Sequence, residues 1–122
     1  MPEKIYQNLV DKTNSERWKY AVELGRHGKP AMDLLIAAMN DEDKWVRYLV
    51  ADALGSIPDP QVVDSLIAAL LDGDQDVRFV AAEALGRVGD RRAIEPLEKT
   101  CTGDNCYVRI AAEEAIARLR LG

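Results

Sequence analysis

A repeat with a period of 31 residues constrains this chain more than any other feature. The segment that starts at Asp74 has one counterpart starting at Asp43 and another starting at Asn105. Each copy has a polar residue, then a Val-Arg pair, then an alanine-rich stretch. Self-similarity at a fixed period of this size is typical of stacked repeat proteins. The sequence therefore predicts a stack of similar units.

Each unit is expected to contain two antiparallel helices, a first (A) helix and a second (B) helix. Apolar residues in both follow the i, i+3, i+4, i+7 spacing of one helix face. The links between A and B are short and polar, which favours antiparallel neighbours. We predict an all-α fold, an α-solenoid of about four helix pairs in one domain spanning 1–122. The predicted helices are 3–12, 15–27, 30–40, 44–56, 60–71, 75–87, 91–101 and 105–120, in repeats of about 1–28, 29–58, 59–89 and 90–122.

Polar residues precede several of these helices. Asp43, Asp74 and Asn105 come before the B helices, where their side-chain oxygens are expected to accept from free backbone N–H groups. Asp59 is expected to do the same for the A helix that begins with Pro60, a favoured first residue of a helix. These residues therefore predict where four helices begin.

Glycine and proline give further signals near helix ends. Gly55, Gly86 and Gly89 lie near the ends of B helices, where left-handed backbone is expected. Pro96 lies further into its helix than the other prolines, so the early part of the last A helix should be kinked or loosely formed.

The first and last repeats depart from the inner pattern. Glu98 and Glu113 replace apolar residues of the inner repeats. Near the N-terminus, an alignment at a spacing of 30 puts Glu16, Lys19 and Glu23 at apolar positions, so either the register slips by one residue there or this face meets water. Burying an unpaired carboxylate is unfavourable, so we expect these positions to face water. The outer repeats should then cap the stack, as such arrays require, and the chain should be complete at four pairs.

Composition limits the classes of function. The 16 Lys and Arg against 21 Asp and Glu give a net charge of -5, whereas nucleic-acid binders usually carry a basic face, so no nucleic-acid partner is expected. No apolar run could span a bilayer and no signal peptide is visible, so we expect a cytoplasmic protein without a membrane partner. Cys101 and His27 align with core positions, and Cys106 should be exposed. No catalytic residue, metal site or cofactor is predicted.

The pattern Asp-x-x-Val-Arg-x-x-Ala-Ala-x-Ala-Leu-Gly-x-x-Gly resembles the HEAT-like repeats first grouped with phycobilisome bilin lyases. The resemblance covers residues 30–120 well and 1–29 loosely. It implies a right-handed solenoid with convex A helices and concave B helices. It also implies a structural ladder of arginines beside the polar residues of the turns. That ladder would contain Arg47, Arg78 and Arg109 with Asp43, Asp74 and Asn105.

Large side chains and acids share the sector of the B helices that faces away from each helix's own core. At about 100° per residue, equivalent positions in three successive B helices fall in this sector. We call it the aromatic–acidic row, and it consists of Trp45, Tyr48, Phe79, Tyr107 and Ile110 with Asp52, Asp76, Glu83 and Glu114. Contiguous exposed aromatic side chains tend to be interaction sites, although such rings can instead pack on the next repeat. The family resemblance places the row on the concave surface.

Two functions remain open from the sequence. The first is a non-enzymatic adaptor that holds an unidentified protein or peptide with apolar and basic side chains, as a monomer or a weak homodimer. The second, implied by the resemblance alone, is a bilin lyase-like or chromophore-handling chaperone subunit. The iron-dependent hydroxylase branch of HEAT-like proteins uses several His-Glu pairs, and this sequence has no His-Glu dipeptide. The branch of DNA alkyl-lesion glycosylases needs a basic groove where this row has acids.

Overall fold

The computed structural model describes residues 1–11, 13 and 15–122, and the regular structure within these ranges is helical. Along these described residues, the eight predicted α-helices follow one another, with two 3-10 turns that were not predicted. They are α1 (Pro2–Val10), α2 (Arg17–Arg26), η1 (Lys29–Ala31), α3 (Met32–Ala38), α4 (Lys44–Leu54), α5 (Pro60–Ala69), α6 (Gln75–Val88), η2 (Arg91–Ala93), α7 (Ile94–Gly103) and α8 (Cys106–Leu121). The predicted end of the first helix, at residue 12, lies outside the described residues. None of the described helices is long and apolar enough to cross a membrane.

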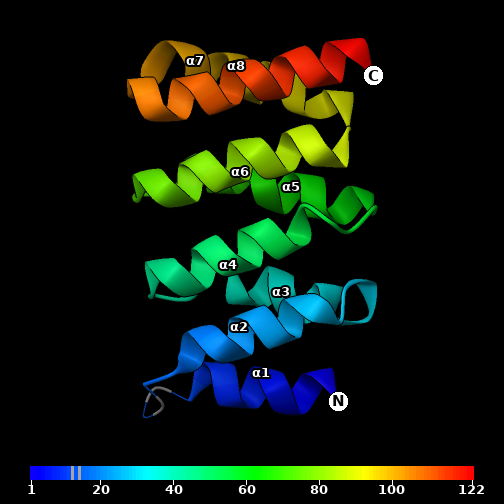
Figure 1. Cartoon of the computed structure of the whole chain (residues 1–122), viewed down its shortest axis with the longest axis vertical. Coiled ribbons are helices and arrows are strands. Elements are labelled where there is room, and N and C mark those ends of the chain that lie inside the picture. The colour runs from blue at the N-terminus through cyan, green and yellow to red at the C-terminus, as the bar shows by residue number, and fades with distance from the viewer. Residues whose placement is uncertain (12, 14) are drawn as a thin grey trace.

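The helices form a stack of antiparallel pairs. The B helices α2, α4, α6 and α8 follow one another along the long axis, with α3, α5 and α7 behind them in Figure 1. Each B helix contacts its own A helix and the B helix of the neighbouring repeat. The two ends of the chain lie at opposite ends of the stack (Figure 1). The predicted α-solenoid is confirmed.

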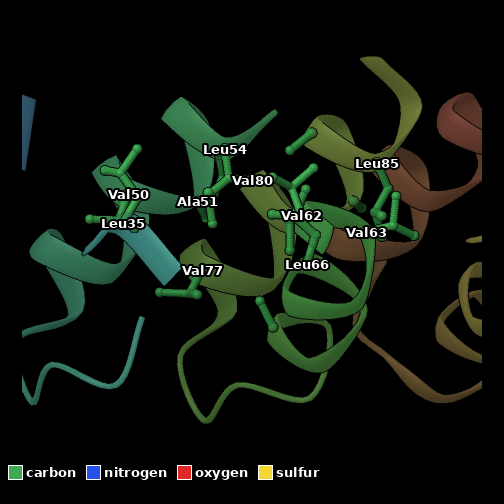
Figure 2. Close-up of a cluster of buried hydrophobic side chains, with 14 of the residues drawn as sticks. Leu35, Val50, Ala51, Leu54, Val62, Val63, Leu66, Val77, Val80 and Leu85 are labelled. Atoms are coloured by element: carbon green, nitrogen blue, oxygen red, sulfur yellow. The ribbon is translucent and has the colours of Figure 1, made fainter. Parts of the chain in front are cut away.

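The core runs along the whole stack between the two layers. Figure 2 shows its central part, where side chains from α3 to α6 meet. Many of the valines and leucines at the predicted apolar positions are fully buried, among them Val46, Val50, Leu54, Val63, Leu66, Val77 and Leu85. Burying one such side chain contributes about 1.5–3 kcal/mol, so the repeated apolar face is what holds the pairs together.

The predicted helix starts are confirmed. Asp43, Asp59, Asp74 and Asn105 each accept a hydrogen bond from a backbone N–H of the following first turn, at 2.8–3.2 Å. A 3-10 turn, η2, precedes α7, so α7 itself begins at Ile94. Pro96 therefore lies in the first turn of α7, where its missing N–H has no partner to lose.

The prediction for the glycines is correct at one position only. Gly89 ends α6 with φ 81°, but Gly55 has φ -64° and Gly86 has no positive φ. A Cβ atom added at Gly55 would lie 2.7 Å from the Cβ of Ala84, and one at Gly86 would lie 3.2 Å from that of Ala115. These two glycines allow neighbouring B helices to approach closely.

The charged residues that were expected to cap the two ends of the stack face water. All five charged residues of the predicted caps are exposed, namely Glu16, Lys19, Glu23, Glu98 and Glu113. Cys106 is exposed and Cys101 is half-buried. The core position expected for His27 is wrong, because this residue is exposed at the C-cap of α2 in the outermost repeat.

Candidate functional site

An arginine ladder joins successive repeats, with carboxylates other than those expected. Arg47 donates through Nε and Nη2 to Asp72, at 2.8 and 3.1 Å. Arg78 donates in the same way to Asp104, at 2.7 and 3.1 Å. The Nη1 of each arginine donates to a carbonyl oxygen of its own turn, that of Asp41 for Arg47 and that of Asp72 for Arg78. Each arginine thus joins its own A–B turn to the turn of the following repeat.

The predicted ladder partners have another role. Asp43, Asp74 and Asn105 use their side-chain oxygens to cap the B helices, whereas the side-chain hydrogen bonds of Arg47 and Arg78 go to the carboxylates of Asp72 and Asp104. The third predicted arginine, Arg109, is exposed, and its guanidinium makes no hydrogen bond within the described part of the chain. In the inner part of the ladder, Arg78 keeps only 19% of its side chain exposed.

The large side chains of the aromatic–acidic row form two ring pairs. Trp45 and Tyr48 meet edge to face at a centroid distance of 6.1 Å and an interplanar angle of 67°. Phe79 stacks on Tyr107 of the next repeat at 4.3 Å and 3°. Trp45, Tyr107 and Ile110 are 53%, 44% and 51% exposed, whereas Tyr48 and Phe79 are half-buried against the core. The row therefore combines packing residues with exposed residues on three successive B helices.

One acid of the row, Asp52, forms an ion pair. Asp52 accepts from the Nη2 of Arg87 at 2.8 Å, a contact between α4 and α6. Burial raises the pKa of Tyr48, and the charges of Asp52, Glu83 and Asp76 raise it further. The three carboxylates therefore lie close enough to this hydroxyl to give the centre of the row a negative potential, which Arg87 reduces on one side.

The negative charge continues toward α8. Burial raises the pKa of Tyr107, and the nearby Asp76 carboxylate raises it further. A polar hollow of about 300 Å³ is lined partly by Glu83, Glu114 and Arg118. The structure thus brings all nine predicted residues of the row onto neighbouring parts of α4, α6 and α8.

Larger hollows lie on the A-helix layer. One of about 600 Å³ is lined by residues of α3 and α5 and of the turn after α3, and one of about 360 Å³ is lined by residues at the end of α5 and along α7. The smaller one is lined partly by Leu71, which is 87% exposed. These hollows offer volume, whereas the aromatic–acidic row offers exposed rings beside charge. Protruding rings suit contact with another chain, so we take the row as the candidate site despite its smaller hollow.

No metal centre is found in the part of the chain that the structure describes. No group of three or more His, Cys, Asp or Glu side chains there lies close enough together to hold a metal ion. Burial raises the pKa of the Cys101 thiol, and the charge of Glu113 raises it further, while Arg109 acts in the opposite direction. These three residues therefore lie near one another at the last repeat.

The sequence matches HEAT repeats over residues 2–79 and 32–117. The chain belongs to the HEAT-repeat family. Its fold is similar to that of human deoxyhypusine hydroxylase in complex with glycerol, with a TM-score of 0.87 and 27% identity over 98% of this chain and 43% of that one. It is also similar to the complex of CpcE and CpcF of phycocyanin lyase from Nostoc sp. PCC7120, with a TM-score of 0.83 and 28% identity over 98% and 53%.

These likenesses cover this chain almost completely but only about half of each related chain. The phycocyanin lyase structure supports the resemblance to HEAT-like repeats of the lyase group. No curated protein sequence matches the chain. The comparisons therefore establish the repeat family and the solenoid, and both related structures carry names of proteins with enzymatic roles.

Proposed function

We propose that this protein is a non-enzymatic adaptor that binds a segment of another protein on the aromatic–acidic row. The observation that carries this proposal is the half exposure of Trp45 on α4 and of Tyr107 and Ile110 on α8, on either side of Phe79 on α6. Large rings at a surface are the side chains that most often dominate binding energy between proteins. A HEAT-repeat array suits this role because it offers an extended surface of rigid helices.

The rings are held in place before any partner arrives. Phe79 and Tyr107 stack with parallel planes, and Trp45 contacts Tyr48 at its edge. Side chains that are already ordered lose less conformational entropy on binding, which favours affinity. The nearby carboxylates favour a partner whose apolar anchors are flanked by Lys or Arg, and they chiefly speed its association.

The structure identifies which residues test the proposal best. Tyr48 and Phe79 pack against the core, so removing them would destabilise the fold as well as the surface. Trp45 and Ile110 are each about half exposed and can be removed with less effect on packing. Leu71, which is 87% exposed on the other layer, provides a matched control for the loss of a large apolar side chain.

The experiment is a selection of peptides from a random library displayed on phage, with the wild-type protein as bait. The enriched peptides should carry apolar and basic side chains, and their affinities are then measured by calorimetry. We expect Trp45→Ala with Ile110→Ala to weaken these peptides about tenfold or more, which corresponds to about 1.4 kcal/mol. Leu71→Ala should leave them unchanged. Peptides that bind the double variant as well as the wild type would place the site elsewhere.

Charge reversal then separates steering from anchoring. Glu83→Lys should slow association of the same peptides, with an effect that shrinks as salt rises. Asp52 is a poor choice for this test, because its substitution would also break the contact with Arg87.

A second candidate is a subunit that handles a bilin chromophore in the manner of a lyase. The observation that favours it is the likeness to the CpcE and CpcF complex of phycocyanin lyase. The exposed rings of the row could stack on a tetrapyrrole. Adding a bilin to the protein should then shift the visible absorbance of the chromophore, and Trp45→Ala with Ile110→Ala should abolish the shift. An unchanged spectrum with the wild type would exclude this candidate.

A further inference from the structure

The junctions between repeats share one ionic contact. In each of them, an arginine of one B helix pairs with an aspartate in the A–B turn of the following repeat. The three pairs are Arg17 with Asp41, Arg47 with Asp72, and Arg78 with Asp104. In all three, both side chains are at most 19% exposed. The arginine always faces the following repeat, and the aspartate always faces the preceding one.

The first repeat carries an aspartate equivalent to those of the inner junctions. Asp11 lies 30 residues before Asp41 and accepts from the backbone N–H of Thr13 at 3.0 Å. Asp41 accepts from the N–H of Asp43 in the same way at 2.8 Å. Asp11 is therefore held in the turn conformation of the inner aspartates, but it is exposed. No basic side chain pairs with it among residues 1–11, 13 and 15–122.

The last repeat carries the matching arginine. Arg109 lies 31 residues after Arg78 on α8, in the position from which the inner arginines reach the next turn. It is exposed, and it lies near Cys101 and Glu113 on the outer side of the last repeat. Asp11 in the first repeat and Arg109 in the last therefore occupy complementary positions of the ladder, near the two opposite ends of the described stack (Figure 1).

A second contact between repeats shows the same complementarity. Arg87 on α6 pairs with Asp52 on α4 across the junction of the second and third repeats. One repeat later, Arg118 and Glu83 line the same polar hollow between α6 and α8. The acidic residue of the last repeat that is equivalent to Asp52 and Glu83 is Glu114, which is exposed. The basic position in the first repeat is Arg26, at the end of α2, and it is also exposed.

We propose that two copies of this chain associate head to tail, with Arg109 of one copy on Asp11 of the next and Glu114 on Arg26. The contact uses the same ion-pair positions as the inner junctions and joins two different surfaces, so it can continue into short open oligomers. It uses the ends of the stack, and of the aromatic–acidic row it engages only Glu114, so its argument does not depend on the proposed adaptor function.

The end-to-end contact differs from the inner junctions because it does not bring two B helices close together. At the inner junctions a glycine such as Gly86 meets an alanine such as Ala115. The equivalent residues at the ends are Ala117 and Glu23, both exposed. A glutamate at this position keeps the helices of two copies further apart and leaves the contact mostly ionic. We therefore expect a weak, reversible association that salt disrupts.

The test is sedimentation velocity of the full chain over a range of concentrations at low salt. The average mass of the wild type should rise above 13.5 kDa with concentration and return toward it as salt is added. Arg109→Asp and Asp11→Arg should each remain monomeric, because each variant presents like charges to its own copies. Arg91→Asp, which makes the same change of charge at an exposed residue of η2, should associate as the wild type does.

An equimolar mixture of Arg109→Asp and Asp11→Arg gives the decisive result. Every junction between the two variants again joins Arg to Asp, so the mixture should recover the mass of the wild type. A wild type that stays at 13.5 kDa up to about 1 mM would overturn the proposal, since this concentration corresponds to only about 4 kcal/mol of binding free energy. A mixture that stays monomeric would overturn it too. Association that persists in both single variants would show that copies meet through another surface.

Discussion

Replacing Arg78 by alanine should destabilise the stack by removing three hydrogen bonds at once. Its guanidinium holds both carboxylate oxygens of Asp104 and the backbone carbonyl of Asp72. The side chains of Arg78 and Asp104 are only 19% and 13% exposed, so water does not replace the lost partner freely. The substitution therefore leaves a half-buried carboxylate whose remaining donor among the described residues is the N–H of Asn105.

The magnitude lies between two limits. A fully exposed ion pair contributes about 0–1 kcal/mol, whereas removing one partner of a fully buried pair costs about 3–5 kcal/mol. Since this pair is mostly but not completely buried, we expect Arg78→Ala to lower the free energy of unfolding by about 1–3 kcal/mol. For a domain of this size the melting temperature should fall by about 3–5 °C for each kcal/mol.

The effect should depend on pH with a definite sign. Burial alone would raise the pKa of Asp104, but the hydrogen bonds from Arg78 and from the Asn105 N–H outweigh it and hold the pKa below its usual value. A carboxylate with a lowered pKa in the folded state stabilises the fold above its unfolded pKa and loses this contribution as pH falls through the folded value. The difference between wild type and Arg78→Ala should thus be full at neutral pH and shrink below about pH 4.

Chemical denaturation followed by circular dichroism measures this difference, and the chain supplies its own control. Arg109 occupies the equivalent place on α8 but is exposed, so Arg109→Ala should change the stability by no more than about 0.5 kcal/mol. The measurement is made at micromolar concentration to keep the protein monomeric. Equal destabilisation by both substitutions, or none by Arg78→Ala, would refute the assignment of Arg78 as a joint between repeats.

Two further substitutions test the packing and the capping. A Cβ added at Gly55 would lie 2.7 Å from that of Ala84, so Gly55→Ala should cost about 1–3 kcal/mol. Gly73→Ala, where a Cβ meets nothing within 4 Å, should show no loss in the same denaturation assay. Asp74→Ala removes the cap of α6 and should cost about 1 kcal/mol, with Asp74→Asn recovering most of it.

Most of the fold could be predicted because each repeat has the same spacing of apolar residues and the same polar residue before its B helix. The apolar spacing of α6 recurs in α4 and α8, and the polar cap precedes each of them, so local pattern and stack agree. The roles of Gly55 and Gly86 could not be predicted from one helix. A glycine near a helix end usually indicates left-handed backbone, and only the neighbouring helix shows that the missing Cβ matters here.

The ionic contacts of the site were predicted less well than the row itself. Helix arithmetic placed the large side chains in one sector, because that depends on one helix at a time. It did not reveal that Arg87 pairs with Asp52 or that Arg47 pairs with Asp72, since these contacts join different repeats. The available signal was an aspartate two residues before the cap in two successive turns, at Asp41 and Asp72.

Packing and binding are often treated as alternative explanations of a ring on a solenoid surface, but in this row they apply to different parts of the same group. Phe79 stacks on Tyr107 of the next repeat, and this contact joins α6 to α8. Tyr107 nevertheless keeps 44% of its surface exposed, and Trp45 keeps 53%. A partner would therefore meet rings whose inner sides are already fixed. For this reason a lost interaction after removal of Phe79 would not distinguish the two explanations. A lost interaction after removal of Trp45, in a protein that still melts normally, would support binding alone.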